Sequence, residues 1–264
     1  MNQVIRRVML VVAGAQGLLA VAFVMQWTIA VRLWPFPGTT PLTYLFVASI
    51  LAAACASTAW AAASKNDGAL AGIALDYVAI FTPVSIFSYQ LAARGGDTSM
   101  TIQAIVGGIG AVTGAALFAW SSRIPIDSRI PMPRLVRWSF VVFVALLWVV
   151  SFRLILNLPT IPWTLTPALS IVVGWMFFGA SIYFAYALVR PSWINATGQL
   201  LGFLAYDLVL IGPFVSRLST VSAEHRPGLI LYTAVLVYSG MLAIWLLFIR
   251  RDTRMWRRAA QRSV

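Results

Sequence analysis

The sequence predicts an all-α polytopic membrane protein with eight transmembrane helices arranged as two four-helix repeats. Composition is the first indication: 61% of the 264 residues are hydrophobic and 10% are charged, whereas about a quarter of the residues in a soluble domain are charged. The apolar residues also form long blocks of about 20, which is the length that spans a bilayer as a helix. A membrane β-barrel would instead show short alternating segments.

Eight apolar blocks follow one another along the chain, and each is long enough to cross a bilayer. They cover residues 8–31, 41–63, 69–92, 101–120, 135–156, 165–189, 194–215 and 228–249. The polar, proline-rich stretch SSRIPIDSRIPMPR separates the fourth block from the fifth. The chain therefore divides into a first membrane half (1–120), a cytoplasmic linker (121–134), a second membrane half (135–249) and a basic tail (250–264).

The start of the first apolar block has features of a signal peptide. Arg6 and Arg7 precede the block, and AVA at 20–22 has the small residues of a cleavage site. The apolar run continues beyond this point through FVMQWTIAV. We therefore expect an uncleaved first helix.

The positive charge of the chain predicts its orientation. The net charge is +12, from 19 Lys and Arg against 7 Asp and Glu. With the N-terminus inside, five of the 19 cations face outward and the other 14 face inward; the outer five are Arg32, Arg94, Arg153, Arg217 and Arg226. This is the positive-inside pattern. We therefore expect a multi-pass protein of a bacterial-type cytoplasmic (inner) membrane, with both termini in the cytoplasm.

The same cations indicate lipid rather than nucleic acid as the partner. They fall at the ends of apolar blocks, where lipid phosphates and the topology signal explain them. The tail, RRDTRMWRRAAQR, is expected to lie on anionic lipids of the inner leaflet. Gly110-x-x-x-Gly114 predicts a close helix contact, more often within the chain than between subunits, so a homo-oligomer or a membrane complex stays open.

Several chemistries have no candidate residues. Cys55 is the only cysteine, His225 the only histidine and Lys65 the only lysine. This argues against a disulfide, a histidine-built haem or metal site, and a retinal Schiff base within a helix. The sequence also has no phosphate-binding glycine loop and no serine–histidine pair placed for acyl transfer. We expect no cofactor, and an enzyme is the less favoured class.

The two halves share sequence signals. The segments VRLWPFPGTTPLT (31–43) and FRLILNLPTIPWTLTPAL (152–169) both place Arg-Leu, prolines, a tryptophan and Thr-Pro before a helix. The segments GIALDYVAIFTP (72–83) and GFLAYDLVLIGP (202–213) both carry a glycine, an acid and a proline. We expect a parallel repeat about the membrane normal, with Asp76 as the counterpart of Asp207; such repeats occur in transporters and also arise by simple duplication.

The two acids are the main candidates for a functional site. Helix rise places Asp207 about 20 Å and Asp76 about 10 Å from the inner ends of their spans. An ionised carboxylate at mid-bilayer costs about 2.5–3.5 kcal/mol, so we expect Asp207 to face the bundle interior. The acids could bind a proton or cation, act as a catalytic acid, or fix helix packing as protonated hydrogen-bonding groups. Pro83 and Pro213 follow them and could free a backbone carbonyl as a ligand.

Four more side chains complete the candidate substrate- or ion-binding set. Tyr77 and Tyr206 flank the acids in sequence and could hydrogen-bond them. Arg32 and Arg153 end the first and fifth spans, from which they could reach lipid phosphate or turn inward toward an acid.

The stretch LWPFPGTTPLTYLFVASILAAA (33–54) resembles a segment of uncharacterised bacterial multi-pass membrane proteins. The residues that carry the resemblance are Trp34, Pro35, Pro37, Thr40, Pro41, Leu42 and Thr43. It covers about two spans and implies no activity. The eight-span plan with buried acids is also similar to bacterial lysoplasmalogenase-type membrane hydrolases, although their local motifs are not matched here.

Three functions follow as hypotheses. The first is a small carrier of an ion or a hydrophobic solute, with Asp76 and Asp207 near the site. The second is a non-catalytic membrane subunit or assembly factor, in which the acids only fix packing. The third is an intramembrane enzyme acting on lipid.

Overall fold

The computed structural model describes residues 3–126 and 130–255, and within these ranges the chain is all-α with no strand. Eight of its helices are long and apolar enough to cross a membrane, which confirms the predicted fold class. They are α1 (Gln3–Val24), α3 (Pro41–Ser64), α4 (Leu70–Ala93), α5 (Thr98–Ser121), α6 (Arg134–Ile155), α7 (Pro167–Val189), α8 (Trp193–Arg217) and α9 (Arg226–Ile244). Three short elements complete the chain: helix α2 (Thr28–Leu33), the 3₁₀ turn η1 (Asp67–Ala69) before α4, and the π-helical turn η2 (Trp245–Ile249) after α9.

The first span is shorter than predicted. The apolar block at 8–31 was expected to form one helix, but α1 ends at Val24 and α2 begins at Thr28. Gln26 between them has a left-handed backbone, with φ of 49°. A non-glycine residue in this region interrupts a right-handed helix, and an apolar pattern does not reveal such a turn.

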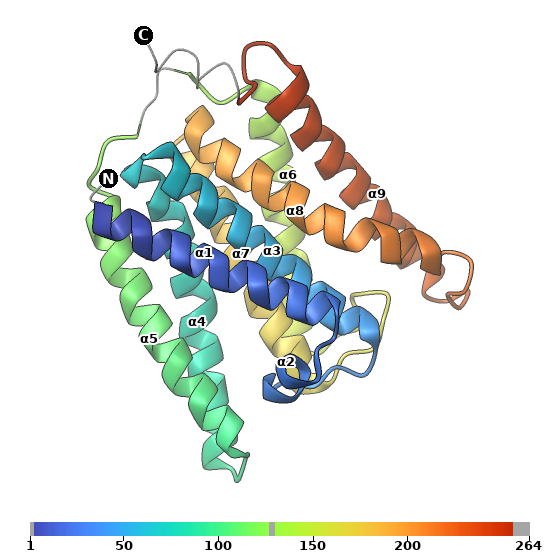
Figure 1. Cartoon of the computed structure of the whole chain (residues 1–264). Helices are drawn as coiled ribbons and strands as arrows, with labels where there is room; N and C mark the ends of the chain where they lie inside the picture. Colours follow the sequence, from blue (N-terminus) through green and yellow to red (C-terminus); the bar gives the residue numbers. More distant parts are fainter. Residues whose placement is uncertain (1–2, 127–129, 256–264) are drawn as a thin grey trace.

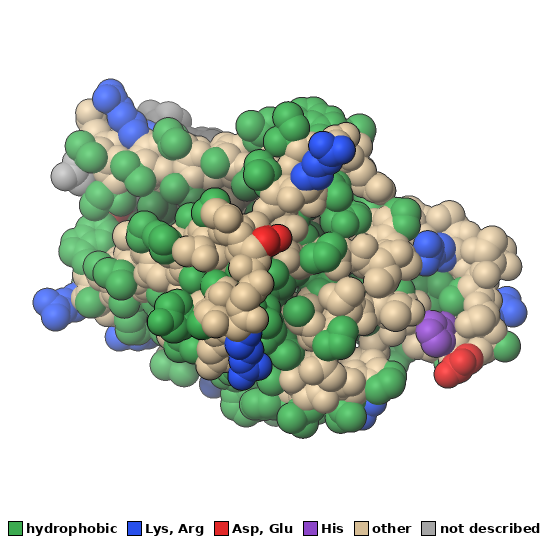
Figure 2. Space-filling model, turned by 90° about the horizontal axis from the view of Figure 1, so that it is seen from below, with side chains coloured by type: hydrophobic (Ala, Val, Ile, Leu, Met, Phe, Trp, Pro, Cys, Tyr) green, Lys and Arg blue, Asp and Glu red, His purple; other side chains and the backbone are tan. Residues whose placement is uncertain are grey.

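The helices alternate in direction and place the connections on two faces of the molecule (Figure 1). We call one the terminal face; it carries Gln3 and residues 65–69, 122–126, 130–133, 190–192 and 250–255. The opposite face carries residues 25–40, 94–97, 156–166 and 218–225. Seen from below the view of Figure 1, the charged side chains stand apart from one another among hydrophobic and uncharged groups (Figure 2).

Neighbouring helices pack in pairs, and two contacts join the halves. Helix α1 packs on α3, α4 on α5, α6 on α7 and α8 on α9. The halves meet where α3 packs on α8 and where α4 packs on α7. The α1–α3 pair corresponds to α6–α7, and the α4–α5 pair corresponds to α8–α9, when each span is matched with the span four places later. The same match relates the α3–α8 contact to the α7–α4 contact, which is the pattern that a repeat would produce. The repeat itself stays a prediction, which superposition of the halves would test.

Glycines allow several of these helix pairs to approach closely. A Cβ on Gly110 would lie 2.9 Å from the Phe81 ring, and one on Gly114 would lie 3.2 Å from the Ala74 carbonyl oxygen. The predicted close-packing face is therefore confirmed as a contact between α5 and α4 within the chain. A Cβ on Gly202 of α8 would lie 2.7 Å from the Ser57 hydroxyl of α3.

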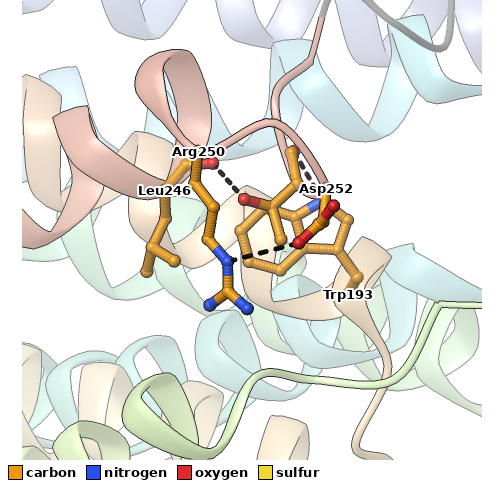
Figure 3. A network of polar contacts seen from close by, with 5 residues as sticks. Trp193, Leu246, Arg250 and Asp252 are labelled. Carbon is orange, nitrogen blue, oxygen red and sulfur yellow. Dashed lines mark hydrogen bonds and ion pairs between the residues drawn. The ribbon is translucent and has the colours of Figure 1, made fainter.

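The first residues of the tail contact the start of α8 and the turn η2 at the end of α9 (Figure 3). The Trp193 indole N–H, at the start of α8, donates to the Thr253 carbonyl at 3.1 Å. The Thr253 hydroxyl in turn donates to the Leu246 carbonyl at 2.6 Å, and Arg250 forms an ion pair with Asp252 at 3.8 Å. Residues 250–255 are therefore attached to the end of the bundle, with Arg251 and Arg254 exposed. The expectation that the tail lies on lipid stays a prediction, and residues 256–264 lie outside the described part of the chain.

The linker also contacts the start of α8. The backbone N–H of Trp193 donates to the Ile130 carbonyl at 3.0 Å, and Pro131 pairs with Ser192 in an isolated β-bridge. Linker and tail both contact Trp193, while α3 and α7 cover Gly198 and Gln199, and residues 193–200 are all buried. This contact fixes one end of the helix that carries Asp207.

Candidate functional site

Asp207 lies inside the helix bundle. It occupies the middle of α8, is 3% exposed, and points toward α9. Its Oδ2 lies 2.9 Å from the Ser239 hydroxyl, and a Cβ on Gly240 would lie 3.4 Å from the same oxygen. Its Oδ1 has no hydrogen-bond partner among the described residues. Asp207 therefore faces the bundle interior, as expected from the free-energy cost of placing a carboxyl group in lipid.

The contacts of Ser239 favour a protonated Asp207. The Ser239 hydroxyl lies 2.9 Å from the Asp207 carboxyl and 2.8 Å from the Val235 carbonyl, but it has one proton to donate. If Asp207 is ionised, both neighbours need that proton. If Asp207 is protonated, it can donate to Ser239 while Ser239 donates to Val235. The neutral acid therefore satisfies both contacts without a cation.

Asp76 lies where the two halves meet. It projects from α4 toward α7, and a Cβ on Gly179 of α7 would lie 2.5 Å from Asp76 Oδ1. This oxygen is buried and has no hydrogen-bond partner in the described chain. The residue as a whole is partly exposed, unlike Asp207. Asp76 is therefore close-packed on one side and open to its surroundings on another.

A set of polar side chains connects to Tyr77 and Tyr183 near Asp76, and we call it the polar layer. The Tyr77 hydroxyl accepts a hydrogen bond from Gln16 Nε2 at 2.6 Å and lies 3.1 Å from the Thr58 hydroxyl. The Tyr183 hydroxyl lies beside Ser57 and close to Gly198. The polar layer consists of Gln16 of α1, Ser57 and Thr58 of α3, Asp76 and Tyr77 of α4, Tyr183 of α7 and Gln199 of α8.

The amides of the polar layer leave acceptor oxygens unpaired. Gln199, 1% exposed, donates through Nε2 to the Tyr183 carbonyl at 2.7 Å, and its Oε1 has no partner in the part of the chain that the structure describes. Gln16 Oε1 and Asp76 Oδ1 are unpaired in the same way among the described residues. Trp60, in the same part of α3, has a buried Nε1 donor without a partner among the described residues. Sequence reasoning did not select the two glutamines or Tyr183, although an amide within an apolar block was a usable signal.

The predicted tyrosines do not bind the neighbouring acids. Tyr77 hydrogen-bonds Gln16 and Thr58, as described above. Tyr206 hydrogen-bonds Tyr232 of α9, and its ring packs edge-on against Phe46 of α3. The residues that contact each carboxyl are therefore on other helices: Gly179 for Asp76 and Ser239 for Asp207.

The predicted arginines lie away from both acids. Arg32 and Arg153 are exposed on the opposite face. Arg153 donates to the Pro159 carbonyl at 2.8 Å, within its own loop. No ion pair joins either arginine to Asp76 or Asp207 in the described chain. Neither of these arginines is therefore placed to balance an ionised Asp76 or Asp207.

A pocket on the opposite face was not predicted. It has a volume of about 520 Å³ and lies between the α6–α7 loop and the start of α9. Glu224, His225 and Asn157 are among its polar lining residues, and Trp163 forms part of its wall. Among the described residues, no group of three or more His, Cys, Asp or Glu side chains is placed to hold a metal ion.

Comparison with family models, with curated proteins and with solved structures returns no match. The candidate site therefore rests on the chemistry and geometry of this chain.

Proposed function

We propose that this integral membrane protein is a small carrier of an ion or a hydrophobic solute, and that protonation of Asp76 and Asp207 accompanies transport. One observation carries the proposal. Each membrane-embedded carboxyl group has an oxygen with no hydrogen-bond donor, and neither has an arginine or lysine partner in the described chain. Each can therefore accept a proton or a cation that the protein does not itself supply.

The free-energy cost of an ionised carboxylate in the bilayer can couple proton or cation binding at these acids to a change in helix arrangement. An ionised carboxylate near the bilayer centre costs about 2.5–3.5 kcal/mol even on the insertion scale, which corresponds to about a hundredfold or more in population. A proton or a bound cation removes most of this cost. Uptake and release of that charge therefore favour different arrangements of the helices around the acid, as a coupled carrier requires.

The place of Asp76 between the halves supports the same function. In carriers built from repeats, substrate and coupling ions bind where the repeats meet. Asp76 lies where α4 of the first half packs on α7 of the second half. Asp207 belongs to α8, which forms the other contact between the halves through α3.

We further propose that the terminal face lies in the cytoplasm of a bacterial-type inner membrane. The distribution of charge supports this orientation. All five cations assigned to the outer side lie on the opposite face. The described cations of the terminal face are Arg6, Arg7, Lys65, Arg123, Arg134, Arg137, Arg190, Arg250, Arg251 and Arg254. They lie within reach of anionic inner-leaflet lipids.

Proton-coupled cation flux tests the proposed function. Purified protein is reconstituted into liposomes that contain a pH-sensitive dye, and Na⁺, K⁺, Li⁺ and a hydrophobic amine are added outside in turn. We expect one of them to drive proton movement in the wild type, and Asp76→Asn and Asp207→Asn to abolish it. Asp97→Asn is the matched control, since Asp97 is exposed and asparagine also serves well as an N-cap.

The alternative of a non-catalytic membrane subunit predicts a different result. If the acids only fix packing, both asparagine variants should fold and behave as the wild type in every flux assay. The protein would then be expected to co-purify with other membrane proteins. Such contacts could use the apolar surfaces of α1 and α5, which are the least buried of the eight spans.

A further inference from the structure

We propose that the polar layer is a proton-exchange site open to water on the terminal face, with Asp76 as the group that takes up and releases the proton. This rests on the proposed carrier function and goes beyond it, because it assigns different tasks to the two acids. In the substrate-free protein, Asp76 exchanges its proton with the water of one side, and Asp207 keeps its proton inside the bundle. Tyr77 and Tyr183 line the exchange route with their hydroxyl groups.

Depth is the first support. Thr58 and Tyr183 lie six residues before the ends of their helices, at Ser64 and Val189. Asp76 and Gln199 lie six residues after the starts of theirs, at Leu70 and Trp193. All four of these ends are on the terminal face. At 1.5 Å per residue, the four side chains share a level about 9 Å below that face.

Unpaired polar atoms are the second support. Buried polar groups normally have a hydrogen-bond partner, and ordered water provides it where protein does not. Three acceptor oxygens of the polar layer, on Gln16, Asp76 and Gln199, have no partner within residues 3–126 and 130–255. Two or more water molecules among these oxygens and the tyrosine hydroxyls would satisfy them. The same waters would connect Asp76 to the terminal face.

The groups around Asp76 can tolerate a change in its charge. Its own helix supplies Tyr77, α7 supplies Tyr183 and Tyr186, and α3 supplies Cys55. These are neutral groups. Helix α5, which packs along the other side of α4, has no titratable side chain from Thr98 to Ser121. Asp67, in η1, is the other acid near the start of α4.

The exchange itself is a simple proton transfer. The O–H bond of the Asp76 carboxyl breaks, the proton passes to a water molecule, and a carboxylate remains. Water at this depth stabilises the carboxylate, whereas the bilayer centre would not. Asp207 lacks this advantage, since it is 3% exposed and its hydrogen-bond partner among the described residues is Ser239 of α9.

Infrared spectroscopy of the whole protein tests the assignment without a substrate. A protonated carboxyl group has its own carbonyl stretching band, which shifts in D₂O when its hydrogen exchanges. We expect one band that exchanges within seconds and disappears reversibly at high pH, and a second that exchanges slowly and persists. Asp76→Asn should remove the first, and Asp207→Asn the second. A slow, non-titrating Asp76 band would overturn the proposal.

Hydroxyl deletions test the route. Tyr77→Phe and Tyr183→Phe keep the rings and remove the hydroxyl groups. We expect each to slow exchange of the Asp76 band at least fivefold, while the band itself remains. Tyr232→Phe is the matched control, since its hydroxyl binds Tyr206 outside the polar layer. Equal exchange rates in all three variants would contradict a route past Tyr77 and Tyr183.

Access from one side is tested with a cysteine reporter. In a Cys55→Ser background, Thr58→Cys places a thiol in the polar layer and Ser239→Cys places one beside Asp207. A charged, membrane-impermeant thiol reagent should modify Thr58→Cys when it is added on the terminal face, and should leave Ser239→Cys unmodified. Modification of Thr58→Cys only from the opposite face, or from neither face, overturns the proposal.

The two proposals fail in different ways. If the infrared bands behave as expected but no flux is found, the carrier function is wrong and the exchange site stands. If flux depends on Asp76 while its band neither titrates nor exchanges, the carrier function stands and the exchange site is wrong.

Discussion

Gly179 of α7 leaves room for the carboxyl group of Asp76 on α4. A Cβ at Gly179 would lie 2.5 Å from Asp76 Oδ1 and would also meet the side chain of Ile80. Real Cβ atoms do not approach a carboxyl oxygen this closely, so a larger residue at this position must displace the acid or separate the helices. The position of Asp76 between the two halves therefore depends on a missing side chain on the partner helix.

Gly179→Ala should consequently destabilise the protein and disturb Asp76. Overpacking of this kind costs typically 1–3 kcal/mol, which exceeds the gain of about 1 kcal/mol in helix propensity. We expect a lower melting temperature in detergent and a shifted infrared band for Asp76. Gly212→Ala is the control, because nothing lies within 4 Å of a Cβ at that position on α8. A melting temperature at or above that of the wild type for Gly179→Ala would show that the α4–α7 contact is looser than described.

The sequence predicted the spans well because lipid imposes a simple rule. A helix that crosses the bilayer needs a long apolar run, and all eight runs became helices. The interior position of Asp207 follows from the same rule, since lipid offers a carboxyl group no partner. These conclusions need no knowledge of which helices are neighbours.

The composition of the site depended on neighbours, and the sequence did not reveal them. Gln16, Tyr183 and Gln199 are polar residues in apolar blocks, but nothing in the pattern shows that α1, α7 and α8 bring them to Asp76. Register is a second difficulty. Asp76 follows its glycine by four residues and Asp207 by five, so the two acids point in different directions: one contacts α7 and the other α9.

Trp193→Phe should weaken the attachment of residues 250–255 to α8. The substitution removes the indole N–H and leaves the Thr253 carbonyl without that donor. Loss of a buried hydrogen bond costs about 1–3 kcal/mol when one partner remains, and Trp193 is 1% exposed. Trp138→Phe, on an exposed tryptophan of α6, should have little effect on the melting temperature. If both variants melt alike, the contact adds nothing to stability.

Asp97 should make the α4–α5 turn sensitive to acid. Its side chain caps α5, and hydrogen bonds from the Ser99 hydroxyl and from the Ser99 and Met100 backbone hold the pKa of Asp97 below its ordinary value. A lowered pKa means that the carboxylate stabilises the folded state above the unfolded-state value and that this stabilisation is lost as pH falls. The protection factors of the Ser99 and Met100 backbone amides, which correct for the pH dependence of intrinsic exchange, should therefore fall on acidification in the wild type. Asp97→Asn should show no such dependence; an unchanged pH profile in this variant would assign the effect to another group.

The orientation of the protein is open to a direct measurement. Reporter fusions at Val264 and near Gly96 should report opposite sides of the membrane, with Val264 in the cytoplasm. Eight spans and the unequal division of cations between the two faces require this result. A cytoplasmic signal from both fusions would remove the eight-span topology, and the reverse assignment would place the polar layer on the outer side.

The bond between Asp207 and Ser239 can be measured with a double-mutant cycle. Because a protonated Asp207 donates to Ser239, Asp207→Asn keeps a donor of similar shape and should change the free energy of unfolding little. Ser239→Ala leaves a buried carboxyl group without its one partner and should cost about 1–3 kcal/mol, since Ser239 is 1% exposed. The double variant should cost about as much as Ser239→Ala alone, because asparagine loses the same partner. If Asp207 were instead ionised, Asp207→Asn would remove a buried charge and raise stability clearly. Thermal unfolding of the four proteins at one pH therefore separates a neutral Asp207 from a charged one.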